Sequence, residues 1–86
     1  MIKIIYAPNF IRQFKKLPDG FRDEVVEKIE IFKDISNHKI LKVHKLNGQY
    51  KNCYSFSVNY DYRIVFQYES KNEVALLVIG DHDIYK

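Results

Sequence analysis

Several residue types that mark particular protein classes are scarce or missing in this sequence. One cysteine in 86 residues excludes an internal disulfide framework and a multi-cysteine zinc site. Three glycines and two prolines are too few for a low-complexity or disordered chain. No glycine-rich phosphate-binding motif is present, so no cofactor is expected. The composition is that of a small globular protein, which we expect in a reducing cytoplasm.

Long hydrophobic runs are absent as well. No stretch approaches the roughly 20 apolar residues that a membrane span needs. The opening MIKIIY is too short for a signal peptide and is followed by Pro8. We therefore expect no membrane contact. A chain of this length holds one hydrophobic core, so we expect a single domain over residues 1–86.

Acidic residues are missing from one long internal stretch. Residues 35–60 contain four lysines and two histidines but no aspartate or glutamate, although the net charge of the whole chain is only +3. Such a segment suits an edge that faces phosphate groups, and a solvated lysine loop is the alternative. Tyrosines follow the lysines, and cations interleaved with aromatic rings are typical of proteins that bind unstacked RNA bases. The candidate RNA-binding residues are Lys42, Lys45, Lys51 and Tyr54. For any one tyrosine, packing between strands is the alternative.

Hydrophobic periodicity predicts a strand, two helices and three further strands. Alternating apolar residues predict a first strand that ends before Pro8, and helical spacing then predicts a short helix up to Pro18. Asp19 is the expected N-cap of a second helix. The apolar stripe of that helix consists of Phe21, Val25, Ile29 and Phe32.

The last third of the chain predicts a β-meander. Strands are expected at about residues 50–58, 62–68 and 73–79, joined by short turns that make them antiparallel. The expected fold is α+β: a small antiparallel sheet with an N-terminal strand and a helical hairpin packed on one face. The other face would stay open as a binding cleft, and Arg63 would point toward it.

Two residues stand out as candidates for chemistry. Arg63 lies in an otherwise apolar strand and needs an anionic partner, which is either a phosphate or an internal carboxylate from Asp61 or Glu69. His82 directly follows the last strand, and histidine exchanges protons near neutral pH. A surface histidine without a role is the alternative for His82. The neighbouring carboxylates point away from it on an extended chain, so no metal site is expected.

Three segments of the chain form a recognisable set. They are the helix APNFIRQFKKLP, the LNG turn followed by YKNCYSFSVNYDYRIVFQY, and the ending EVALLVIGDHDIYK. Together they cover nearly the whole chain and resemble the RelE/ParE superfamily of type II toxins, in particular its RelE/YafQ-like branch. The resemblance implies a small antiparallel sheet with a helical hairpin on one face.

The resemblance also implies a function and partners. RelE-like toxins are endoribonucleases (mRNA interferases) that cleave mRNA in the ribosomal A site by attack of a 2′-OH on the adjacent phosphate. A cognate antitoxin protein holds them inactive, and no metal is required. By position, Arg63 matches the phosphate-stabilising arginine, His82 a general acid or base, and Tyr85 the closing aromatic residue of the family.

The loop residues have less exact counterparts in the family. His44 looks like the loop histidine of the YafQ branch, while Tyr54 stands where that branch has a second histidine. Lys42 and Lys45 fall in the region where RelE uses lysines. The general base is therefore either His44 or a lysine of this loop.

Two other functions stay open. One is a ParE-like inhibitor of DNA gyrase without nuclease activity, and the other is a degenerate toxin that only binds its partners. Because Arg63, His82 and Tyr85 occur together, the ribonuclease is favoured.

Overall fold

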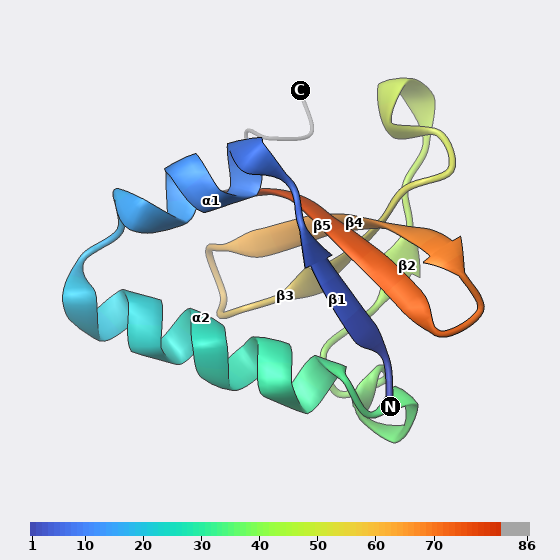
Figure 1. Ribbon diagram of the computed structural model, residues 1–86, viewed down its shortest axis with the longest axis horizontal. Helices are drawn as coiled ribbons and strands as arrows, with labels where there is room; N and C mark the ends of the chain where they lie inside the picture. The colour runs from blue at the N-terminus through green and yellow to red at the C-terminus, as the bar shows by residue number, and fades with distance from the viewer. Residues whose placement is uncertain (82–86) are drawn as a thin grey trace.

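Five strands form one sheet in the computed structural model, which describes residues 1–81 (Figure 1). The strand order is β1-β5-β4-β3-β2, with β1 parallel to β5 and the other neighbours antiparallel. The predicted α+β fold is confirmed, but the sheet is mixed. The short hairpins make β3, β4 and β5 antiparallel, whereas β1 reaches its place beside β5 independently of any hairpin. The strands are β1 Lys3–Tyr6, β2 His44–Lys45, β3 Tyr54–Ser57, β4 Arg63–Ser70 and β5 Glu73–Gly80.

Two helices follow β1 in the sequence, before the other strands, and form the predicted helical hairpin. They are α1, Pro8–Lys15, and α2, Asp19–Phe32. Asp19 is the first helical residue and not the predicted N-cap, because Pro18 takes that position with an extended backbone at ψ 150°. The Asp19 carboxylate pairs with Arg22 instead. Within residues 1–81, neither helix has the length and apolar character of a membrane span.

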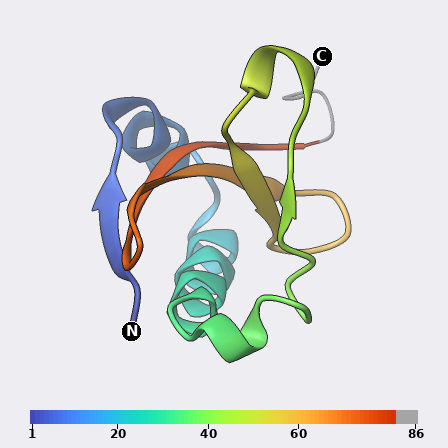
Figure 2. The same ribbon diagram turned by 90° about the vertical axis from the view of Figure 1, so that its right-hand side faces the viewer.

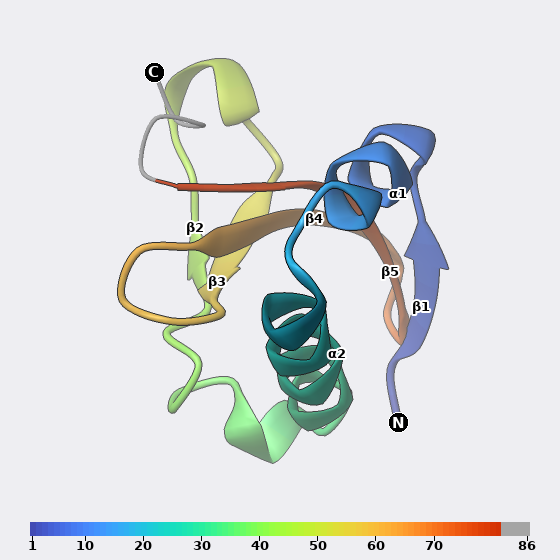
Figure 3. The same cartoon turned by 90° about the vertical axis from the view of Figure 1, so that its left-hand side faces the viewer.

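Each helix contributes buried apolar residues to one core on the same face of the sheet. Figure 3 shows α2 running below β4. The Phe32 side chain of α2 lies at the centre. Its ring is stacked on Phe56 of β3 at a centroid distance of 4.3 Å and meets Phe66 of β4 edge-on at 4.8 Å. Val25 and Ile29, also predicted in the stripe, are buried in the same core, while Phe21 is partly buried at its edge.

The opposite face of the sheet is partly covered, and the prediction that it is open is wrong for its middle. Leu46, Cys53 and Val65 form a second buried cluster there. The predicted strand from residue 50 starts only at Tyr54, because Gly48 and Asn52 both have a φ of 70° and fold the chain over the sheet. A 3-10 helix, η2 (Gly48–Tyr50), stands in this segment (Figure 2). Burial raises the pKa of the Cys53 thiol, as expected for a packed, apolar cysteine.

Replacing Phe32 should reveal how much the fold depends on this one ring. Phe32→Ala leaves a cavity between α2 and the sheet and is expected to lower the free energy of unfolding by about 3–5 kcal/mol. Urea denaturation followed by circular dichroism measures the change. Ile40→Ala, at a side chain that is 77% exposed, is the control and should change stability by less than about 0.5 kcal/mol. Equal effects of the two variants would contradict this view of the core.

Candidate functional site

A cavity of about 390 Å³ lies beside the β3–β4 hairpin. Two of its lining side chains are cations, and the others carry a hydroxyl, an amide and a phenol. The lining residues are Lys42, Ser57, Asn59, Tyr60 and Arg63. Since these groups offer hydrogen-bond donors and no carboxylate, the cavity suits an anion such as a phosphate group.

Arg63 is held at this cavity by the pairing of three strands. As the first residue of β4, it lies opposite Ser57 of β3 and Gly80 of β5. Its Nη1 donates a hydrogen bond to Ser57 Oγ at 2.5 Å, and the side chain is partly buried. The guanidinium has five N–H donors, so this bond leaves most of them for a ligand.

No carboxylate neutralises Arg63 within the described part of the chain. The ion pairs between residues 1 and 81 are Arg22–Asp19 and Lys33–Glu30. The alternative in which Asp61 or Glu69 pairs with Arg63 is therefore not what the structure shows. With no carboxylate paired to it among residues 1–81, this partly buried cation suits an external anion.

Lys42 reaches the cavity through a tight bend of the chain. Its backbone is left-handed, with a φ of 58°. The preceding residue is fixed to β3, because Ser57 N donates a hydrogen bond to the Leu41 carbonyl oxygen at 2.8 Å. This bond brings Lys42 and Ser57 to the same cavity, so two cations from distant parts of the sequence face one ligand site.

His44 does not line the cavity, but it follows two residues after Lys42, which does. It is the register partner of Ser55, so it shares the sheet face of Arg63, diagonally across β3. Its Nδ1 is 2.9 Å from the Lys42 carbonyl oxygen. A carbonyl oxygen only accepts, so Nδ1 carries the hydrogen, and neutral His44 keeps a lone pair on Nε2. His38, by contrast, is stacked on Phe32 and hydrogen-bonded to its carbonyl oxygen.

The hairpin turn beside Arg63 is fixed by its own hydrogen bonds. Asn59 Oδ1 accepts from the backbone N–H groups of Asp61 and Tyr62 at 2.9 and 2.8 Å. The Tyr62 ring then packs edge-on against Phe21, with 4.8 Å between centroids. Between these anchored residues, Tyr60 points outward and is 89% exposed.

The other candidate residues lie elsewhere or outside the described chain. Tyr54 and Lys45 are register partners on the face opposite to Arg63, and the Tyr54 ring packs against Phe66 and Tyr68. Lys51 is exposed and does not line the cavity. His82 and Tyr85 lie outside the residues that the structure describes. Within residues 1–81, no three His, Cys, Asp or Glu side chains are grouped to hold a metal ion.

The sequence prediction missed Ser57, Asn59 and Tyr60 as parts of one site. The sequence did contain a signal for Ser57. A tight turn centred on Tyr60 pairs the residues three positions before and after it, which are Ser57 and Arg63. Tyr60 lines the cavity together with Lys42, and no sequence pattern predicts the bend of the chain at Lys42.

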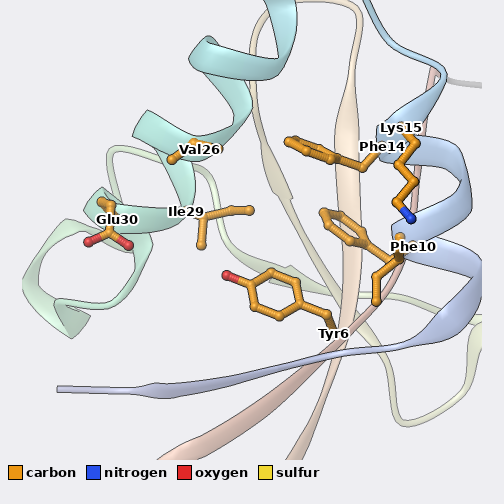
Figure 4. Close-up of a pocket in the computed structure, with 8 residues that line it drawn as sticks. Tyr6, Phe10, Phe14, Lys15, Val26, Ile29 and Glu30 are labelled. Carbon is orange, nitrogen blue, oxygen red and sulfur yellow. The ribbon is translucent and has the colours of Figure 1, made fainter.

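A second pocket of about 350 Å³ lies between β1, α1 and α2 and differs in character (Figure 4). Rings from β1 and α1 face aliphatic side chains of α2 across it. Only one cation and one carboxylate border it, so it lacks the paired donors of the first cavity. Its lining is Tyr6, Phe10, Ile11, Phe14, Lys15, Val26, Ile29 and Glu30. This composition is that of a contact surface rather than a site for phosphate chemistry.

Solved toxin structures share this backbone at low sequence identity. The RelBE2 toxin–antitoxin complex from Mycobacterium tuberculosis matches with a TM-score of 0.73 and 20% identity, covering 94% of this chain and 98% of that chain. YafQ from E. coli matches with a TM-score of 0.70 and 15% identity, covering 98% and 97%. The archaeal RelE–RelB complex from Pyrococcus horikoshii matches with a TM-score of 0.72 and 17% identity, covering 93% of both chains. These likenesses establish the fold.

The family assignment comes from the sequence. No curated protein sequence matches this chain. The model of one family, described as RelE-like toxin of type II toxin-antitoxin system HigB, matches residues 12–82. The matched span includes the cavity with Lys42 and Arg63, and it confirms the predicted RelE-like type II toxin. The chain belongs to the HigB-like family of RelE-like toxins of type II toxin–antitoxin systems.

Proposed function

We propose that this toxin is a metal-independent endoribonuclease that cleaves mRNA in the ribosomal A site, with the scissile phosphate bound between Lys42 and Arg63. RelE-family toxins are ribonucleases, so family membership supports cleavage of RNA. The observation that carries the proposal is the cavity itself: two cations converge on it with no carboxylate among its described lining residues, on the sheet face that also bears His44.

The proposed reaction is an internal phosphoryl transfer within the RNA. His44 Nε2 accepts the proton of the ribose 2′-OH, and the 2′ oxygen forms a bond to the adjacent phosphorus. The bond from phosphorus to the 5′ oxygen breaks, and His82 donates a proton to that leaving oxygen. The products are a 2′,3′-cyclic phosphate and a 5′-hydroxyl end. Arg63 and Lys42 stabilise the charge that develops on the phosphate oxygens.

His82 and Tyr85 enter the proposal through sequence position. Gly80 is the register partner of Arg63, and His82 follows two residues later. We therefore propose His82 as the general acid and Tyr85 as a residue that stacks on an RNA base or takes part in proton transfer. Tyr54 and Lys45 lie on the other sheet face, so neither contacts the phosphate in the proposed site. Exposed Lys45 and Lys51 are proposed to contribute only long-range attraction to RNA.

The proposed partners are the ribosome with its mRNA and a cognate antitoxin. The solved structures of similar fold include complexes of a toxin with its antitoxin. An acidic segment of the antitoxin would suit the acid-free stretch of residues 35–60. The substrate places the reaction in the cytoplasm, and the toxin domain is proposed to span residues 1–86.

Primer extension on a defined mRNA tests the proposed reaction. Purified toxin should cut at A-site codons when programmed ribosomes are present and not on the mRNA alone. His82→Ala and Arg63→Gln should each slow cleavage by about 10²–10⁴-fold, because each removes a group that acts in the transition state. Lys71→Gln, at an exposed lysine of the β4–β5 turn, is the charge control and should cleave normally. The absence of cuts from folded wild-type toxin would contradict the proposal, and a gyrase supercoiling assay would follow.

The pH dependence separates the two histidines. A base must be neutral and an acid protonated, so kcat/KM should rise and then fall with pH. His44→Gln should therefore flatten the acidic limb, while His82→Gln flattens the alkaline limb. Initial cleavage rates at pH 5–9 measure both, and unchanged limbs in the His44 variant would assign the base to another residue.

The effect of the Lys42 side chain on cleavage can be measured separately from the effect of its left-handed backbone on stability. A left-handed backbone strains a lysine by about 1 kcal/mol, and glycine adopts it without strain but loses more chain entropy on folding. Lys42→Gly should therefore leave the free energy of unfolding within about 0.5 kcal/mol while it slows RNA cleavage at least about tenfold. Urea unfolding and primer extension on one preparation measure both effects. Normal cleavage by the stable variant would remove Lys42 from the site.

A further inference from the structure

Tyr60 is the aromatic residue among those that line the cavity with Lys42 and Arg63, and it has no role in the proposed reaction. It lines the cavity together with Lys42 and Arg63, yet its side chain is 89% exposed. A large ring contributes little to stability when it faces water. Packing in the core therefore does not account for this ring.

The other tyrosines between residues 1 and 81 are packed to a greater degree. The Tyr62 ring meets Phe21, and the Tyr54 ring contacts those of Phe66 and Tyr68. Tyr50 is partly buried and packs against the second buried cluster. The next most exposed of the described tyrosines is Tyr6, at 45%. Tyr60 thus presents an accessible aromatic face, and that face stands beside two positive charges.

The turn holds the Tyr60 backbone in place before any ligand arrives. Asn59 Oδ1 binds the N–H groups of Asp61 and Tyr62, and the Tyr62 ring is anchored on Phe21 of α2. Only the two side-chain torsions of Tyr60 remain to be fixed when a ligand binds. A tyrosine on a preformed turn therefore offers contact area at low entropic cost.

We propose that Tyr60 stacks on the RNA base of the nucleotide whose phosphate lies between Lys42 and Arg63. A phosphate in a cationic cavity and a base on an aromatic ring at its rim together recognise one unstacked nucleotide. Purines have the larger π-face, so Tyr60 makes the toxin prefer a purine at this nucleotide. The inference rests on the proposed function and adds a residue that determines specificity.

Binding of a short RNA that cannot react tests this role. The probe is a fluorescent hexanucleotide of adenosines with 2′-O-methyl groups, which lack the attacking hydroxyl. Tyr60→Ala should weaken its binding about 5- to 100-fold, the range for loss of one base stack. Tyr60→Phe keeps the ring and should bind like the wild type, whereas Tyr60→Leu should bind like Tyr60→Ala. Ile40→Ala, which removes an exposed apolar side chain from the same basic stretch, is the control and should bind normally.

The base is tested by removing it from the probe. A set of hexanucleotides, each with one abasic position, should contain one member that binds the wild type as weakly as the full probe binds Tyr60→Ala. For that member, Tyr60→Ala should cause no further loss. Uracil at the same position should bind the wild type less tightly than adenine, and this difference should vanish in Tyr60→Ala.

Arg63→Gln separates failure of this inference from failure of the proposed function. If Arg63→Gln weakens RNA binding and Tyr60→Ala does not, the phosphate site stands and base stacking is overturned. Equal binding by Tyr60→Leu and Tyr60→Phe would also overturn it, since an apolar contact would then suffice. If neither variant weakens binding of a probe that the wild type binds, both proposals fail. If the wild type does not bind the probe, the stacking inference is overturned, while the proposed function is decided by primer extension on ribosomes. A Tyr60→Ala defect in antitoxin binding alone would make this residue a protein contact.

Discussion

The stacking of Phe32 on Phe56 decides which face of the sheet carries the site. With 4.3 Å between ring centroids, this contact fixes β3 with Phe56 toward α2. Side chains alternate along a strand, so Ser57 must point to the other face, and strand pairing places Arg63 beside it. A packing contact in the core thus sets the direction of the arginine on the opposite surface.

Charge is distributed over the molecule in agreement with this division. The segment of residues 19–34, most of which is α2, contains six of the eleven acidic residues, while residues 35–60 contain none. Helix α2 covers the sheet face away from the cavity. A polyanion is therefore disfavoured along α2 and attracted to the side of Lys42 and Arg63. This separation lets a chain with a net charge of only +3 present one basic face, which the proposed binding of RNA requires.

Much of the fold could be predicted from the sequence because its elements are strongly periodic. The α2 stripe and the β4 and β5 strands followed from apolar spacing, and the direction of Arg63 followed from strand alternation. The same alternation predicts Tyr54 on the helix-facing side together with Phe56, which conflicts with its prediction as an RNA-binding residue. The LNG turn was predicted, and glycine and asparagine adopt positive φ more readily than other residues, but local sequence does not show that the bends at Gly48 and Asn52 fold this segment over the sheet. Because these bends cover the sheet, the site is a cavity at the hairpin and not an open cleft.

The central claim is that the cavity beside the β3–β4 hairpin binds RNA. Its most direct test is an NMR titration of isotope-labelled toxin with a non-cleavable 2′-O-methyl oligoribonucleotide. We expect the largest changes in chemical shift at residues that line the cavity, namely Lys42, Ser57, Tyr60 and Arg63. Changes concentrated at Tyr6, Phe10 and Val26 in the apolar pocket, or no changes at all, would contradict it.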